Sequence, residues 1–148
     1  LRDALLKLTV EDRTLGAGPD GKLLLALRPV GIGSGQATLD KKGTLVIGVD
    51  SDWYGIPTHA KYKANILTSI EKKMAKAVEE IIKSGVDGKF TGGDANQYVG
   101  TLANGGVGLA PFHDYASKVN PDLQSQLDAI TKGINDGSIK VTSPSSPK

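Results

Sequence analysis

The chain has 148 residues, a formal net charge of +2 and no cysteine, and 39% of its residues are hydrophobic. This length suits one domain with a core of its own, and the composition is ordinary for a globular protein. The small charge and the scattered lysines do not indicate a nucleic-acid partner. The lack of cysteine excludes disulfides, thiol catalysis and cysteine-ligated zinc. No apolar run approaches the roughly 18 residues that a membrane-spanning helix needs.

The first 30 residues show no recognisable chemistry. Residues 3–11 fit a short amphipathic helix, and residues 22–27 form an apolar run of strand or helix type. The chain opens on Leu1 instead of methionine and shows no signal peptide. We therefore expect either a processed start or a fragment of a longer protein, and we favour the fragment.

From residue 31 onward the pattern indicates an α/β protein. We expect a glycine-rich turn over 31–35 and a short helix over 36–42. Residues 44–49 are apolar and β-branched without alternation, which is typical of a strand buried on both faces of a parallel sheet. A loop over 53–63 follows. Apolar residues at helical spacing then predict an amphipathic helix over 67–84.

The remaining elements are a strand, a helix and a closing strand. Residues 98–102 read as a strand, and Asn120 with Pro121 predicts the start of a last helix that ends at Gly137. Residues 139–141 are expected to form a closing strand. Strands that alternate with helices predict an α/β fold with a mostly parallel sheet flanked by helices.

Two acids are the strongest candidates for a binding site. Asp50 and Asp52 follow the strand predicted over 44–49, and ligands of open parallel sheets bind beyond the carboxyl ends of the strands. A carboxylate at this place can accept two hydrogen bonds from a vicinal diol. The alternative is a solvated turn or a helix cap, where aspartate is common. Trp53 comes next and could either stack on a planar ligand or cover a hinge.

Other candidates carry weaker signals. Gly31 and Gly33 suggest a dinucleotide fingerprint, but Gln36 stands where its third glycine is required. What remains is a turn at which backbone can closely approach a ligand or a neighbouring segment. Lys72 lies about 160° from the apolar stripe of its predicted helix, so it is either solvated or functional. The two histidines fit no metal-ligand spacing and no nucleophile has a catalytic setting, so we expect no metal, no cofactor and no enzyme activity.

Several segments together resemble a known family. Residues 46–52 (Val-Ile-Gly-Val-Asp-Ser-Asp), 66–72 (Ile-Leu-Thr-Ser-Ile-Glu-Lys), 98–114 and 134–141 occur in the same order as in the C-terminal region of the basic membrane protein family. These are the purine-nucleoside-receptor-like substrate-binding lipoproteins of ABC transporters. The resemblance begins near residue 31 and does not extend to residues 1–30. It assigns 31–142 to the C-terminal part of such a protein and leaves 143–148 as a polar tail.

The resemblance implies a type I periplasmic-binding-protein fold with two hinged lobes and a nucleoside between them. It implies that Asp50 binds ribose hydroxyls, that Lys72 reaches the ligand, and that Gly31 and Gly33 offer backbone groups to the sugar. Trp53 departs from the family, which often has glutamine at this position.

The resemblance also implies an ABC permease as partner and a place in the cell envelope, either periplasmic or anchored to the plasma membrane. Membrane attachment would come only through an N-terminal lipid anchor that this chain lacks.

Two other functions stay open at this point. Type I binding-protein folds also serve as ligand-sensing domains of transcription regulators, although no helix-turn-helix segment is present. An enzyme such as a nucleoside hydrolase is a third interpretation, but Asp50 and Asp52 alone are weak evidence for a catalytic site.

Overall fold

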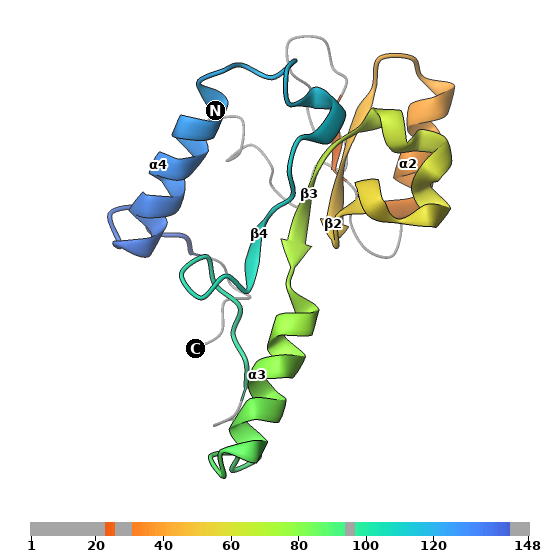
Figure 1. Ribbon diagram of the computed structural model, residues 1–148. Coiled ribbons are helices and arrows are strands. Elements are labelled where there is room, and N and C mark those ends of the chain that lie inside the picture. Colours follow the sequence, from red (N-terminus) through yellow and green to blue (C-terminus); the bar gives the residue numbers. More distant parts are fainter. Residues whose placement is uncertain (1–22, 26–30, 94–96, 143–148) are drawn as a thin grey trace. The chain divides into compact units, whose positions relative to one another are not determined.

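The computed structural model describes residues 23–25, 31–93 and 97–142, and the chain divides into two compact units (Figure 1). Unit 1 runs to Glu71 and includes Leu109–Ala116, whereas unit 2 consists of Lys72–Gly108 and the residues from Ser117 onward. The strands follow the sheet order β1-β2-β3-β4 and are Leu23–Leu25, Leu45–Asp50, Ile66–Lys72 and Val107–Leu109. Both β1 and β3 pair with β2 in parallel. The α/β class with a mostly parallel sheet is therefore confirmed.

Strand β2 confirms the predicted strand, shifted by one residue. Its side chains alternate between buried and half-buried, so one face is closed off more fully than the other. Val46 on β2 lies opposite Ile66 on β3 in the strand register. These two side chains form a core with Trp53 and Tyr62, against which Ile56 packs.

The segment expected to be a loop over 53–63 is instead two 3-10 helices. η1 spans Trp53–Gly55 and η2 spans Pro57–Asn65, with a break in the helical backbone at Tyr62. Pro57 suits the first position of η2, because its backbone has no N–H that would need a partner. The two helices bring the aromatic rings into the core of unit 1.

The predicted glycine turn over 31–35 is wrong, because these residues form the first half of helix α2, Gly31–Asp40. Glycine has a low helix propensity, and this segment contains three glycines. The helix forms nevertheless, because tertiary packing supplies most of the stability of a helix in a protein. A Cβ at Gly35 would lie 2.4 Å from the Tyr62 ring, so only glycine lets α2 approach η2 this closely. Asn65 Nδ2 also donates to the carbonyl and the hydroxyl oxygens of Thr38, at 3.1 and 3.0 Å.

The predicted helix over 67–84 is only half correct. Its second part is helix α3, Met74–Val86, whereas its first part is strand β3. The hydroxyls of Thr68 and Ser69 bond to neighbouring segments of unit 1. Lys72 is consequently the last residue of a strand, and the helical angle assigned to it from the sequence is wrong.

Unit 2 departs from the prediction before its last helix. Residues 98–102 are not a strand; the short strand β4 follows the turn at 104–106 instead. Asn104 organises this turn, because its Oδ1 accepts hydrogen bonds from the N–H groups of Thr101 and Gly106 at 2.8 and 2.9 Å. Its Nδ2 donates to the Val99 carbonyl at 2.9 Å. The hydrogen bonds of the Asn104 side chain thus stabilise a loop where the sequence predicted a strand.

The last helix, α4, spans Leu123–Asn135. It begins after a turn in which Asn120 Oδ1 accepts from the Asp122 N–H at 2.9 Å, so the predicted start is confirmed to within three residues. Gly137 ends the helical segment with φ of +80°, as expected for a C-terminal glycine. Residues 139–141 are not a strand, because Ile139 N–H bonds to the Gly133 carbonyl at 2.8 Å instead.

The helix expected over 3–11 and the tail at 143–148 lie outside the described residues. The strand-or-helix run at 22–27 contains β1, so its described part is a strand. None of the helices in the described part of the chain is long and apolar enough to cross a membrane.

A candidate ligand site at the end of strand β2

Asp50 is the last residue of β2, and its backbone is unusual. Its φ is +77°, in the left-handed region, and only 6% of its surface is exposed. For a residue other than glycine, such a conformation costs about 1–3 kcal/mol and persists where the surrounding structure enforces it. Residues with strained backbones of this kind are often found at binding and catalytic sites. The strand register sets Asp50 opposite Glu71 of β3, at the carboxyl end of both strands.

The turn after Asp50 is held by Trp53. The indole Nε1–H donates to the Val49 carbonyl at 3.0 Å, and the Trp53 backbone N–H donates to Ser69 Oγ at 3.0 Å. Only glycine at position 48 leaves room for the indole, since a Cβ there would lie 2.5 Å from Trp53 Cγ. The Trp53 side chain is therefore part of the core and exposes 7% of its surface.

Asp52 has both carboxylate oxygens engaged. Oδ1 accepts from the Tyr54 N–H at 3.1 Å and caps η1, while Oδ2 lies 2.8 Å from Nε2 of His113. The cap was one of the two structural roles that the sequence left open for this acid. The contact with His113 joins the turn after β2 to the segment 109–116 of the same unit.

Tyr54 and His113 form the outer part of this cluster. Their rings stack in parallel, with centroids 3.9 Å apart and planes 5° apart. The Tyr54 hydroxyl donates to Asp114 Oδ1 at 2.8 Å, and Lys63 Nζ lies 3.9 Å from the Tyr54 ring centroid. The hydrogen bond to Asp114, followed by burial and the nearby carboxylates, raises the pKa of Tyr54. The Tyr54 hydroxyl therefore stays protonated as a donor at neutral pH.

Thr68 and Ser69 are site-building residues that the sequence did not single out. Thr68 Oγ1 donates to the Ala110 carbonyl at 2.7 Å, and the Ala110 N–H donates to the Ser69 carbonyl at 2.8 Å. Ser69 is fully buried and Thr68 is 4% exposed. Two adjacent hydroxyl residues inside an apolar strand are the signal that could have found them, because buried hydroxyls need partners.

The other predicted site residues lie at element ends. Lys72 is exposed and is the last residue of β3. Gly31 and Gly33 lie in the first turn of α2, where backbone N–H groups have no partner within the helix. A Cβ at Gly33 would meet nothing within 4 Å, so close packing does not require glycine there.

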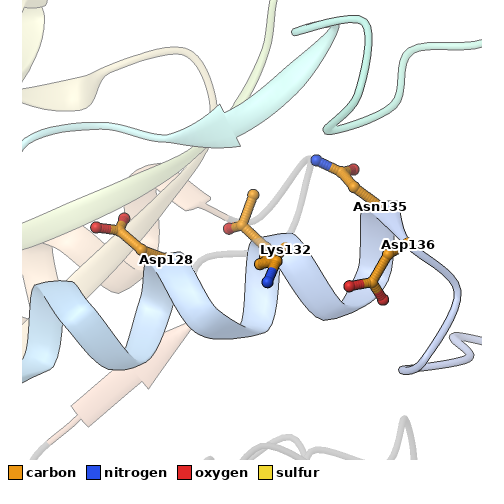
Figure 2. Close-up of a pocket in the computed structure, with 5 residues that line it drawn as sticks. Asp128, Lys132, Asn135 and Asp136 are labelled. Carbon is orange, nitrogen blue, oxygen red and sulfur yellow. The ribbon is translucent and has the colours of Figure 1, made fainter.

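A hollow along helix α4 is a separate feature of unit 2 (Figure 2). Its lining consists of Asp128, Thr131, Lys132, Asn135 and Asp136, all on this helix or at its end. None of the predicted site residues lines it. Since one helix supplies the whole lining, the hollow lacks the converging walls of a ligand pocket. Within the described ranges, no group of histidine and acidic side chains is arranged to hold a metal ion.

Comparisons with known proteins agree with this fold. No family model and no curated protein matches the chain. Solved structures do match, among them two ABC transporter solute-binding proteins. The protein from Conexibacter woesei DSM 14684 has a TM-score of 0.58 at 23% identity, and the match covers 82% of this chain and 37% of that one. The protein from Aeropyrum pernix K1 has a TM-score of 0.60 at 20% identity, covering 86% of this chain and 42% of that one.

The fold is that of a solute-binding protein. The chain spans about two fifths of the length of these neighbours, at 37% and 42%. The resemblance to the basic membrane protein family stays a prediction from the sequence.

Proposed function

We propose that this chain is part of an extracytoplasmic solute-binding protein of an ABC importer and that it binds a purine nucleoside. Two independent observations support the proposal. One is the fold shared with ABC transporter solute-binding proteins. The other is the sequence resemblance to the nucleoside-binding basic membrane proteins, whose matching segments lie in both units. An ABC permease is then the partner that receives the nucleoside.

Asp50 is the observation that carries the proposal. It stands at the carboxyl end of β2, where parallel sheets bind ligands. Its backbone is in the left-handed conformation, and strain of this kind is often found at functional sites. A carboxylate accepts hydrogen bonds on both oxygens, so it suits the adjacent 2′ and 3′ hydroxyls of ribose. Charge-assisted bonds of this kind contribute about 1.5–3 kcal/mol each.

The remaining site residues take supporting roles in the proposal. Lys72 contributes a cation from the end of β3, and Gly31 and Gly33 contribute backbone N–H groups from the first turn of α2. Trp53 exposes only 7% of its surface, so its main role is to hold the turn rather than to stack on the base. Base stacking is assigned to a part of the protein beyond this chain.

The proposed location is the cell envelope, outside the cytoplasmic membrane. The family resemblance supports attachment by an N-terminal lipid anchor on the complete protein. Since affinity in such receptors comes from two lobes that close on the ligand, we expect this chain alone to bind weakly.

A titration with two matched nucleosides tests the proposal. Inosine carries the vicinal diol, and 2′,3′-dideoxyinosine lacks it. In NMR spectra of the ¹⁵N-labelled chain, we expect inosine to shift the amide signals of residues 49–53 at millimolar concentration and dideoxyinosine to leave them in place. Asp50→Asn should abolish the response, whereas Asp128→Asn on the outside of α4 should not. Equal shifts with both nucleosides would contradict the role of Asp50, and no response to either would contradict nucleoside binding.

A further inference from the structure

Two residues with strained backbones lie in two segments that several side-chain contacts join. Among the described residues, Asp50 with φ of +77° and His113 with φ of +44° are the non-glycine residues in the left-handed region. Asp50 precedes the turn that contains Asp52, and Asp52 Oδ2 lies 2.8 Å from His113 Nε2. Strain of this kind survives only where other contacts enforce it. The hydrogen bond between Asp52 and His113 is therefore a candidate for one of the contacts that enforce the strain.

The geometry of this contact leaves its partners little freedom. An ionised carboxylate can only accept, so Nε2 of His113 carries the hydrogen. The stacked Tyr54 ring, at 3.9 Å and 5°, fixes the plane of the imidazole. The second oxygen of Asp52 accepts from the Tyr54 N–H at 3.1 Å, which fixes the carboxylate from the other side. The side chains of His113 and Asp52 are 22% and 29% exposed, so water screens the contact only in part.

We propose that His113 is a positioning residue for the ligand site. Through Asp52, and together with the two Trp53 hydrogen bonds that anchor the same turn, it keeps Asp50 in its left-handed conformation and thereby sets the direction of the Asp50 carboxylate. His113 does not itself touch the ligand. This inference rests on the proposed function, in which Asp50 binds the ribose diol.

Tyr115 provides a matched control for His113. It lies on the same segment, and its hydroxyl donates to the Ala64 carbonyl of η2 at 2.9 Å. Tyr115→Phe removes this hydroxyl and leaves the groups that form the contact between His113 and Asp52 in place. A general loss of stability in the segment should therefore affect both variants, whereas a positioning role should affect only His113.

The first test is a thermodynamic cycle that needs no ligand. Asp50→Gly is introduced into the wild type, His113→Ala and Tyr115→Phe, and the thermal midpoint of each pair is compared. Asp50→Gly relieves the left-handed strain and also removes the contacts of the Asp50 side chain, so the midpoint should shift by the same amount in the wild type and in Tyr115→Phe. The shift should be clearly less favourable in His113→Ala, where the strain is already released. Equal shifts in all three backgrounds overturn the positioning role.

The second test is spectroscopic and uses the folded protein. A left-handed φ gives a strong NOE between the amide and α protons of Asp50. This signal should persist in Tyr115→Phe and weaken in His113→Ala. It should return in His113→Gln, whose amide can donate to Asp52. If His113→Ala does not fold, Asp52→Ala serves as the second variant, because alanine offers no hydrogen-bond partner for His113, and it should weaken the same signal. An unchanged NOE in the folded variants refutes the proposal.

Titration with inosine separates this inference from the proposed function. If the wild type responds to inosine, His113→Ala should lose the response while Tyr115→Phe keeps it. If the wild type does not respond but the cycle and the NOE behave as expected, His113 still positions Asp50 and the assignment of the ligand is wrong. A full inosine response in His113→Ala overturns the positioning role directly.

Discussion

Two glycines of α2 should respond in opposite directions to the same substitution. Gly35 packs beneath Tyr62, and a Cβ built on it lies 2.4 Å from the ring, far inside contact distance. Gly33, two residues earlier, has nothing within 4 Å of such a Cβ. Neither residue has a positive φ, so alanine can adopt both backbones. The pair therefore separates packing from helix propensity within a single helix.

The two effects differ in size and sign. Alanine in place of glycine favours a helix by about 0.5–1 kcal/mol, and this gain applies at both positions. Overpacking costs about 1–3 kcal/mol, and it applies only at Gly35. Tyr62 is 1% exposed and belongs to the core of unit 1, so a shift of its ring would disturb that packing. We expect Gly33→Ala to stabilise unit 1 by about 0.5–1 kcal/mol and Gly35→Ala to destabilise it by about 0.5–2 kcal/mol.

Urea unfolding followed by tryptophan fluorescence measures both variants, because Trp53 is the single tryptophan and lies in the same core. Destabilisation by Gly33→Ala would contradict the helix, because a turn at this position would require glycine for its backbone. Stabilisation by Gly35→Ala would contradict the close packing of α2 on Tyr62.

Three further predictions concern groups of unit 1. Burial lowers the pKa of His59 from its usual 6.5, so the folded state binds the proton less well than the unfolded state, and unfolding free energy should fall as pH drops below about 6.5. Urea midpoints at neutral and mildly acidic pH test this. His59→Phe should reduce the pH dependence of stability, and an unchanged pH dependence in that variant would show that other groups cause it. Ser69→Ala removes the acceptor of the buried Trp53 N–H and should cost about 1–3 kcal/mol in chemical unfolding, and a loss below about 0.5 kcal/mol would speak against that hydrogen bond. Asp114→Asn should lower the raised pKa of Tyr54 in an ultraviolet titration of tyrosinate, with Tyr54→Phe identifying its signal, and an unmoved titration would exclude Asp114 as the main cause.

Much of the fold could be predicted because its signals are local. An apolar β-branched run predicts β2, and the same run predicts that Asp50 stands at the end of a strand. The helix predicted over 67–84 failed at its start, because Leu67 and Ile70 fit a helical period as well as a strand. The strand forms because this segment pairs with β2 and because Thr68 and Ser69 make hydrogen bonds to distant parts of unit 1.

The candidate site could be predicted only in part. The position of Asp50 follows from its strand, but its left-handed backbone has no signature in the sequence. The contact between Asp52 and His113 joins residues far apart in the chain, so no motif or spacing contains it. The sequence offered Trp53 as a stacking residue because it follows the acids, whereas Gly48 opens space for it in the core.

The position of the only tryptophan makes the chain its own fluorescent reporter. Trp53 is three residues from Asp50, and its indole N–H bonds to the Val49 carbonyl at 3.0 Å. Its ring lies 4.6 Å from that of His59, close enough for a protonated imidazole to quench it. Unit 2 contains no tryptophan but does contain α3 and α4. Emission therefore follows the environment of the β2 turn alone, while circular dichroism follows the helices, and a difference between the two unfolding curves would show that the units melt independently.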